Sequence, residues 1–480
     1  MKVALIRPRV INAPDPPLGL LSIAPLLLKQ GFAVRVWDPG PRAEEYIDEV
    51  AAWQPDVVGM SVMTPQYRRA QAAVATLRRR LPRAAFIAGG IHPTALPAET
   101  LTGMDLDAVV TGEGEIAMLR LCQALAAARP PDALPGVWTR NGGTPAPGPP
   151  AELITDLNEI PYPARELVDF EQYLRPPGNI RGLIKRRATS IYTGRGCPFA
   201  CTFCSSHQLF GRKIRQRSVD HVMAEVTELA NKYHIDGLWF LDDTLLENPE
   251  WTARLCHEFR RAGFKFEWGC QGHVRRVNRE LLSEMKASGC VQLEFGVESG
   301  SPRILRVLRK GTVPEDVVAA FRMCRQVGMR TLANFMIGNV GETAEDIDLS
   351  FELARRIRPS HVVVTFTTPM PGSELFRYAQ EHSLLQAPEY GEEWTIRQTE
   401  RPFLPLSLPP EEMIRHRARF DNQFFLRNHL GYLRDPLFLA DVAWRMVKSP
   451  GRYWRGLVQA ARVRRPSHLI ETIWEEYNQI

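Results

Sequence analysis

The run Gly194-Arg195-Gly196-Cys197-Pro198-Phe199-Ala200-Cys201-Thr202-Phe203-Cys204 is the most informative stretch of this sequence. Its cysteines have the spacing C-x3-C-x2-C, which places three thiols on one short loop. Cysteine thiolates hold iron–sulfur clusters, and a four-iron cluster normally takes four of them. The three cysteines therefore predict a [4Fe-4S] cluster with one iron open to a second molecule.

A zinc site is the alternative interpretation of the same loop. Zinc needs a fourth ligand, and His207 follows closely enough to supply it. The flanking residues favour the cluster, because Gly194 and Gly196 allow backbone conformations in which a loop can wrap around an inorganic core. Residues 189–193 are rich in β-branched and aromatic side chains, and they predict a short strand leading into the loop.

The cysteine spacing, with an aromatic residue just before the last cysteine, resembles the signature of the radical S-adenosylmethionine (SAM) superfamily. The resemblance implies that Cys197, Cys201 and Cys204 are the catalytic cluster ligands and that the open iron binds the amine and carboxylate of SAM. One electron from the cluster then splits SAM into methionine and a 5′-deoxyadenosyl radical. The resemblance also implies that Phe203 lies beside the adenine of SAM.

Length and composition indicate a cytoplasmic protein of two or three domains. The chain has 480 residues, of which 44% are hydrophobic and 24% charged. No segment approaches the roughly 20 apolar residues of a membrane span, and residues 1–6 are too short for a signal-peptide core. The net charge of +6 does not by itself indicate a nucleic-acid partner. The remaining cysteines are expected to be buried as small hydrophobic residues: Cys122, Cys256, Cys270, Cys290 and Cys324.

Strand-like and helix-like segments alternate over residues 1–126, which predicts a Rossmann-like parallel sheet with ligands at the carboxyl ends of its strands. The expected strands are 3–6, 33–37, 57–61, 85–88 and 108–110, and the expected helices are 18–29, 43–52 and 68–80. Small or polar residues follow three of these strands, at 61–64, 89–94 and 112–115.

Four runs in this region, 16–20, 56–61, 89–94 and 112–115, resemble the cobalamin-binding domain that precedes the barrel of many radical SAM enzymes. The resemblance implies a set of cobalamin contacts: Ser61, Thr64, Gly89, Gly90 and His92. The motif D-x-H-x-x-G, whose histidine binds cobalt in many such domains, is absent. We therefore expect His92 to be a loop residue near the nucleotide tail of cobalamin rather than a cobalt ligand. A plain nucleotide-binding or vestigial sheet domain is the alternative.

A second series of strands and helices begins near residue 186 and is similar to the partial (β/α)6 barrel of radical SAM proteins. An apolar strand at 237–241 is followed by Asp242 and Asp243, and a strand from 292 ends near Glu298. By resemblance, Asp243 and Glu298 contact SAM. The alternative is that these carboxylates are solvated at helix N-termini.

The sequence departs from cobalamin-dependent relatives at His273-Val274-Arg275, where Arg-Val-Asp is usual. His273 and Arg275 form either an altered pair facing the substrate or a harmless exchange at the barrel rim. A histidine at this position is also able to donate or accept a proton near neutral pH.

We divide the chain into four regions: a cobalamin-binding domain (1–135), a linker with a hairpin (136–185), a radical SAM barrel (186–400) and a helical C-terminal region (401–480). Residues 427–465 contain nine Lys or Arg and two Asp, with Trp444, Tyr453 and Trp454 between them. Such a stretch is either a solvated helical face or a peripheral contact with the inner face of the membrane.

Together these features predict a cobalamin-dependent radical SAM enzyme that methylates an unactivated carbon of a small-molecule or lipid-like metabolite. The implied cofactors are a [4Fe-4S] cluster, SAM and cobalamin, with an electron donor such as flavodoxin or ferredoxin. The alternative enzyme uses the same cofactors for cyclisation, ring contraction or another rearrangement without methyl transfer. The non-enzymatic alternative is a cobalamin or iron–sulfur sensor.

Overall fold

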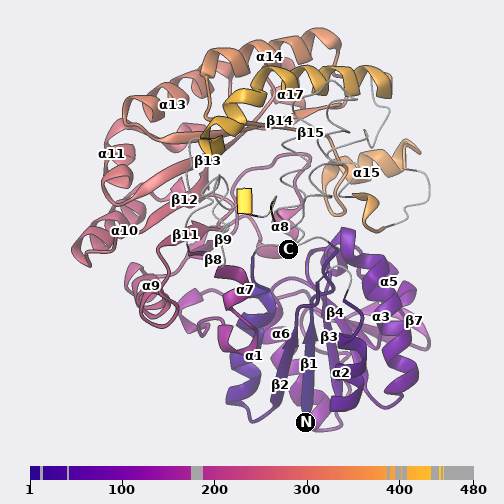
Figure 1. Ribbon diagram of the computed structural model, residues 1–480. Helices are drawn as coiled ribbons and strands as arrows, with labels where there is room; N and C mark the ends of the chain where they lie inside the picture. Colours follow the sequence, from indigo (N-terminus) through magenta and orange to yellow (C-terminus); the bar gives the residue numbers. More distant parts are fainter. Residues whose placement is uncertain are drawn as a thin grey trace.

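The described residues form two large sheets and one small antiparallel sheet of two strands. The computed structural model describes residues 1–10, 15–40, 43–174, 187–385, 390–394, 402, 408–433, 443–444 and 447. Figure 1 shows the first sheet, in indigo and purple, below the strands and helices of the second, in magenta and orange.

The first sheet has the strand order β2-β1-β3-β4-β5-β6-β7, and its first five strands are parallel. Helices α1 and α6 cover one face, and α2 and α3 cover the other. Because both faces are covered, the strands are almost continuously apolar. The strands are β1 (Lys2–Ile6), β2 (Ala33–Trp37), β3 (Val57–Ser61), β4 (Ala85–Gly89), β5 (Ala108–Val110), β6 (Val137–Asn141) and β7 (Thr144–Pro147). The helices are α1 (Leu18–Lys29), α2 (Tyr46–Trp53), α3 (Tyr67–Arg80), α4 (Ile91–Ala95), α5 (Pro97–Gly103) and α6 (Gly114–Ala126).

The hairpin β6–β7 belongs to this first sheet, whereas the sequence placed it in a linker. Strand β6 pairs antiparallel with β5 through Val109 opposite Trp138 and Val110 opposite Val137. Val137 is fully buried on the α1–α6 face, and Trp138 packs against the core on the other face. The hairpin therefore extends the apolar packing on both faces of the first sheet.

The second sheet consists of six parallel strands in the order β15-β14-β13-β12-β11-β8. This arrangement, with helices between successive strands, confirms the predicted fold class of a sheet domain followed by a partial barrel. The strands are β8 (Ala188–Ile191), β11 (Gly237–Phe240), β12 (Glu267–Gly272), β13 (Cys290–Glu298), β14 (Arg330–Ile337) and β15 (His361–Phe366). The helices are α9 (Val219–Tyr233), α10 (Pro249–Arg261), α11 (Arg279–Ala287), α12 (Pro302–Val307), α13 (Pro314–Gln326), α14 (Ala344–Ile357) and α15 (Glu374–Glu381).

The five cysteines outside the loop lie in the two cores, as predicted. Cys122 is buried between α6 and the first sheet. The others are buried in the barrel core: Cys256, Cys270, Cys290 and Cys324.

The junction between the two sheets is made by short elements. These are β9 (Gly194–Arg195), α8 (Ser206–Phe210) and β10 (Arg215–Gln216), together with α7 (Glu171–Leu174) and the linker before it. Helix α8 contacts α4 of the first domain, and Figure 1 shows α8 between the two sheets.

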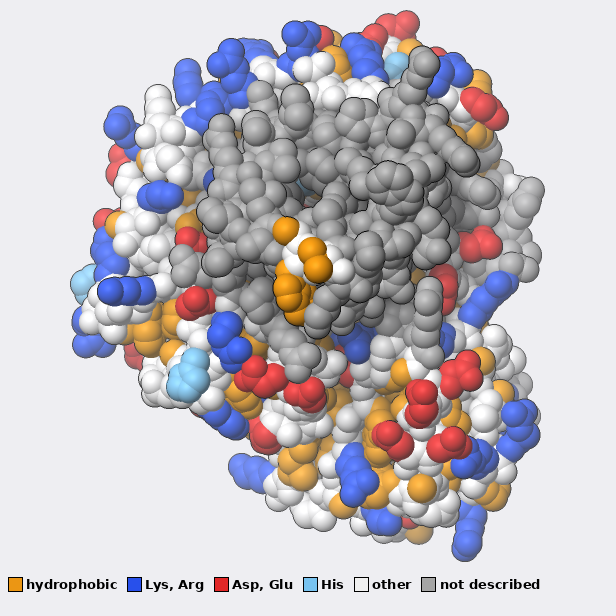
Figure 2. Space-filling model, viewed as in Figure 1, with side chains coloured by type: hydrophobic (Ala, Val, Ile, Leu, Met, Phe, Trp, Pro, Cys, Tyr) orange, Lys and Arg blue, Asp and Glu red, His pale blue; other side chains and the backbone are white. Residues whose placement is uncertain are grey.

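Helix α17 (Pro410–Leu433) packs on β15 and buries Met413 and Phe420 in the barrel core. The basic stretch predicted at 427–465 lies almost entirely outside the residues whose side chains are described. Within the described ranges, no helix is both long and apolar enough to cross a membrane. Figure 2 shows Lys and Arg side chains interspersed with Asp and Glu over the described part of one face.

Candidate active site

The three-cysteine loop connects β9 to α8 and β10 at the junction of the two domains. The backbone of Gly196 has φ +95°, and a Cβ atom there would collide with the carbonyl oxygen of Lys213. Glycine is therefore required at this turn, as the sequence suggested. The N–H of Thr202 donates to the Leu308 carbonyl (3.1 Å), and the Thr202 carbonyl accepts from the N–H of Leu375 (2.9 Å). The loop is thus fixed between the end of α12 and the start of α15.

The three thiols are half-buried and unpaired, and they lie close enough to influence one another. Burial, with smaller contributions from the Asp243 carboxylate and the other two thiols, raises the pKa of Cys197 to about 11. Burial likewise raises the pKa of Cys201 and of Cys204. Coordination to a metal deprotonates a thiol outright. Three neighbouring thiols on one loop fit a cluster in which each cysteine binds a different iron.

The alternative zinc site needs His207 as a fourth ligand beside the three cysteines. Within the described ranges, no group of three or more His, Cys, Asp or Glu side chains has the arrangement that holds one metal ion. His207, the fourth ligand that zinc would need, has its Nε2 atom 3.2 Å from Nε2 of Gln208.

The two carboxylates after β11 have different surroundings. Asp242 is 3% exposed and accepts hydrogen bonds from the backbone N–H (2.7 Å) and the hydroxyl (2.5 Å) of Thr193. Burial raises the pKa of Asp242 to about 6, although these hydrogen bonds lower it. Asp242 therefore fixes the backbone that follows β8 through its hydrogen bonds to Thr193. Asp243 is exposed and accepts a hydrogen bond from the Ser206 hydroxyl. Its carboxylate raises the pKa of the Cys197 and Cys204 thiols. Of the two, only Asp243 faces the cysteine loop with an accessible carboxylate.

Glu298 lies at the end of β13 in a buried ion pair, so the solvated alternative is wrong for this residue. It is 6% exposed, and its Oε1 atom accepts from Nζ of Lys310 at 2.8 Å. The backbone of Glu298 has φ +64°, an uncommon conformation for a residue with a side chain. The pairing of β13 with β14 shifts register between Gly296 and Glu298. This irregularity turns the Glu298 side chain towards Lys310, a residue that the sequence analysis missed.

His273 packs against the cysteine loop, and Arg275 is exposed beside it. The His273 ring stacks on Phe199 of the loop, with centroids 4.1 Å apart and planes inclined by 14°. His273 is 7% exposed, and burial lowers its pKa to about 4, so the ring is neutral at pH 7. Arg275 donates from its backbone N–H to His273 Nδ1 (3.4 Å) and from its guanidinium to the Gly311 carbonyl (3.0 Å). The pair therefore supports the loop and the segment that contains Lys310.

Phe203, predicted to lie beside adenine, packs at the edge of a small apolar cluster. Its neighbours there include Leu375 and Ala379 of α15. Its ring is only partly buried, so it keeps a free surface next to the cysteines on either side of it.

The predicted cobalamin contacts come together at the carboxyl ends of β3 and β4. Ser61 ends β3 and Gly89 ends β4, and the two are paired across the strands. Gly90 has φ +104°, and a Cβ there would lie 3.0 Å from the Val62 carbonyl oxygen. The backbone can therefore turn at Gly90 because no side chain is present.

His92 lies in the short helix α4, not in a loop as predicted. It is 1% exposed, and its Nδ1 is 3.1 Å from the Thr64 hydroxyl. The ring packs between Tyr67 and Tyr390, at centroid distances of 4.8 and 4.7 Å. Its Nε2 has no hydrogen-bond partner within the described ranges. An unsatisfied buried nitrogen beside a glycine turn fits a site that receives a polar ligand group.

A buried ion network joins the two domains at the base of the cysteine loop. Arg195 and Arg215 are opposite each other in the β9–β10 pair, and both donate to Glu113 of the first domain. The distances are 3.0 Å from Arg195, and 2.8 and 2.9 Å from Arg215. Arg195 also pairs with Glu115. The Glu113 side chain is fully buried, and Glu113 directly precedes α6. The sequence indicated the 112–115 run as a binding motif but not this contact.

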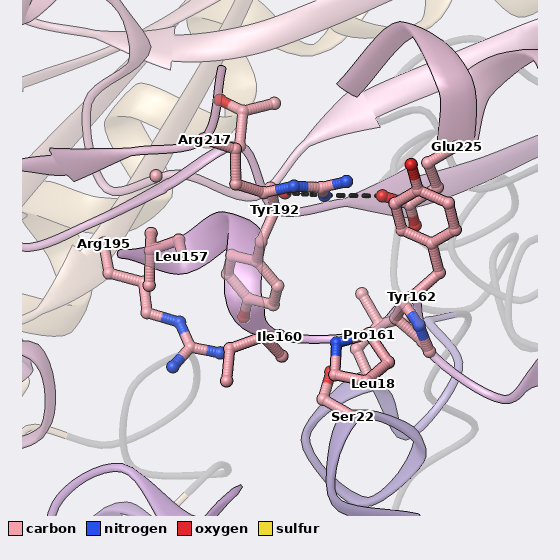
Figure 3. A pocket seen from close by; sticks show the side chains of 13 residues that line it. Leu18, Ser22, Leu157, Ile160, Pro161, Tyr162, Tyr192, Arg195, Arg217 and Glu225 are labelled. Atoms are coloured by element: carbon pink, nitrogen blue, oxygen red, sulfur yellow. Dashed lines mark hydrogen bonds and ion pairs between the residues drawn. The ribbon is translucent and has the colours of Figure 1, made fainter. Parts of the chain in front are cut away.

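Beside this network is a small cavity at the domain junction (Figure 3). It is bordered by α1, by the linker around Ile160–Tyr162 and by Tyr192, Arg195 and Arg217. Figure 3 shows the pairing of Arg217 with Glu225, which is also bonded to Arg165 of the linker (2.6 Å). The cavity volume of about 40 Å³ has room for a few water molecules.

Comparison with known proteins agrees with this architecture. Residues 9–121 match the profile of the B12 binding domain, and residues 191–354 match that of the radical SAM superfamily. An uncharacterised methyltransferase of Pyrococcus horikoshii is 31% identical, over 80% of this chain and 84% of the relative. An anaerobic magnesium-protoporphyrin IX monomethyl ester cyclase of Rubrivivax gelatinosus is 27% identical, over 69% and 59%. The hopanoid C-3 methylase of Methylococcus capsulatus is 26% identical, over 87% and 77%.

The fold is also that of a solved structure. The radical SAM methyltransferase TsrM from Kitasatospora setae superposes with a TM-score of 0.68 at 21% identity, over 81% of this chain and 77% of that one. The chain belongs to the cobalamin-dependent radical SAM superfamily. It is thus a radical SAM enzyme whose cofactors are a [4Fe-4S] cluster, SAM and cobalamin.

Proposed function

We propose that this enzyme is a C-methyltransferase that acts on an unactivated carbon of a small-molecule or lipid-like metabolite. Cys197, Cys201 and Cys204 hold the cluster, and Phe203, Asp243 and Glu298 contact SAM. When bound, the cofactors supply a radical that removes hydrogen from carbon and a methyl group carried on cobalt. An electron donor such as flavodoxin or ferredoxin supplies the electron.

The observation that favours this proposal is the buried contact between the cysteine loop and the strand ends of the cobalamin domain. Arg195, two residues before Cys197, is bonded to Glu113 and Glu115. This contact joins the loop proposed to hold the cluster to the domain proposed to hold cobalamin. The proposed cobalamin contacts on the other side are Ser61, Thr64, Gly89, Gly90 and His92.

The names of the relatives support both methylation and its alternative. The name of the hopanoid C-3 methylase supports methyl transfer to a lipid-like substrate. The cyclase relative favours a second candidate function, ring formation with the same cofactors.

An isotope experiment separates these two functions. The substrate is first identified by comparing metabolites of wild-type and gene-deletion cells. Purified enzyme is then given SAM with a deuterated methyl group, and the mass of the product is measured by mass spectrometry. We expect the product to gain the labelled methyl group, with one 5′-deoxyadenosine and one S-adenosylhomocysteine per product. An unlabelled product, formed with deoxyadenosine but without S-adenosylhomocysteine, would reject methyl transfer in favour of cyclisation or rearrangement.

The role of His92 is tested by spectroscopy of bound cob(II)alamin. We expect an electron paramagnetic resonance spectrum without nitrogen splitting from a lower axial ligand, because the D-x-H-x-x-G motif is missing and the His92 ring is packed between two tyrosines. A His92→Ala variant should show the same spectrum, again without this nitrogen splitting. Nitrogen splitting that is present in the wild type and absent in the variant would show that His92 binds cobalt.

A further inference from the structure

Lys310 is a buried cation to which the roles above assign nothing. It follows α12, and its side chain is 12% exposed. Its Nζ atom donates to Glu298 Oε1 at 2.8 Å, and the Glu298 side chain is 8% exposed. A buried lysine normally has a partner, because an unpaired buried charge is costly. Glu298 is that partner, and the question is what the pair does beside the cysteine loop.

The surrounding backbone makes room for this ion pair. A Cβ atom on Gly296 would collide with Glu298 Oε1 and would lie 2.7 Å from Lys310 Nζ. The two charged groups therefore lie directly over the backbone of β13, in space that any side chain at position 296 would fill. The pair occupies a defined place and is not two mobile surface side chains.

The same segment is hydrogen-bonded to the cysteine loop. The Thr202 N–H donates to the Leu308 carbonyl (3.1 Å), and its hydroxyl donates to the Val307 carbonyl (3.4 Å). On the other side, Arg275 holds the carbonyl of Gly311. Lys310 is thus fixed from both directions relative to the loop.

The charges of Lys310 and Glu298 act on the thiols with opposite signs. Burial raises the pKa of Cys201, Lys310 lowers it and Glu298 raises it. Burial alone would lower the pKa of Lys310, but Glu298 and Cys201 outweigh this and raise it. Opposite charges at short range in a partly desolvated site interact more strongly than in water.

We propose that Lys310 and Glu298 form a balanced charge pair, in which each residue offsets the shift that the other alone would cause in the reduction potential of the cluster held by the cysteine loop. The Lys310 ammonium raises the potential because it stabilises the added electron, and the Glu298 carboxylate lowers it. This inference rests on the proposed cluster site. It gives the pair a role in accepting the electron, in addition to the proposed contact of Glu298 with SAM.

The test is a redox titration of the anaerobically reconstituted full-length protein without SAM, followed by electron paramagnetic resonance of the reduced cluster. We expect Lys310→Met to lower the reduction potential of the cluster by about 59 mV, which corresponds to a tenfold decrease in the equilibrium constant for one-electron reduction. Glu298→Gln should raise the potential by a similar amount, and the double variant should lie near the wild type. Lys310→Arg, which keeps the charge, and Lys286→Met, an exposed lysine on α11, should leave the potential unchanged.

The opposite signs distinguish a charge effect from a general disturbance of the site. Shifts in the same direction for the two single variants, or none in either, would overturn the inference. If Lys310→Met takes up no cluster, Glu298→Gln decides, because a raised potential supports the pair and an unchanged one rejects it. Wild-type protein that binds no iron would instead overturn the proposed cluster site and, with it, this inference.

Discussion

A Cys201→Ala variant is expected to lose both the cluster and the cleavage of SAM. The three thiols come from one loop fixed by Gly196 and by the hydrogen bonds of Thr202, so the substitution removes a ligand from a fixed position in that loop. Wild-type protein reconstituted without oxygen should bind about four irons at this site. The variant should lose most of this iron and form no 5′-deoxyadenosine when SAM and a reductant are supplied.

The matched control for this experiment is Cys324→Ala. Cys324 is fully buried in the barrel core on α13 and lies outside the loop. The control should keep about four irons and full SAM cleavage, because only a small buried side chain is shortened. A Cys201→Ala protein that bound iron and cleaved SAM like this control would refute the assignment of the loop as the cluster site.

The second large effect is expected for Glu113→Ala, which should destabilise the fold by about 3–5 kcal/mol. Glu113 is fully buried and accepts from Arg195, Arg215 and the backbone N–H of Ile154 (2.7 Å). Its removal leaves Arg215 as a buried guanidinium without its carboxylate. The measurement is the midpoint of urea unfolding compared with the wild type.

Glu152→Ala is the control, since it removes a glutamate from an exposed ion pair with Arg120. Exposed ion pairs contribute about 0–1 kcal/mol, so the midpoint should scarcely change. Equal effects of the two substitutions would contradict the importance of the buried network.

Much of the fold was predictable because hydrophobic patterns are local. The sequence predicted α1 at 18–29 and β2 at 33–37 with the same bounds as in the structure. Helices α4 and α5 were missed because Pro93 and Pro97 lie within 91–103, a run that resembles a loop. Proline is compatible with the first turn of a helix, and Pro97 occupies that position in α5.

The contacts at the candidate site were less predictable because they join distant residues. The bond between Arg195 and Glu113 spans 82 residues, and no periodic pattern relates the two. Lys310 resembles any other lysine in sequence, and only the irregular pairing near Gly296 brings it to Glu298. The cysteine loop could be recognised because its ligands are contiguous.

The ion network at the junction has a consequence for exchanging domains between relatives. A barrel transferred to another cobalamin domain carries Arg195 and Arg215 with it, whereas Glu113 and Glu115 stay behind. A productive chimera therefore needs carboxylates in the new domain at the start of the helix that corresponds to α6. Where they are missing, two guanidinium groups lose their partners next to the cysteine loop. Compatibility of the two halves therefore depends on these four side chains as well as on overall sequence identity.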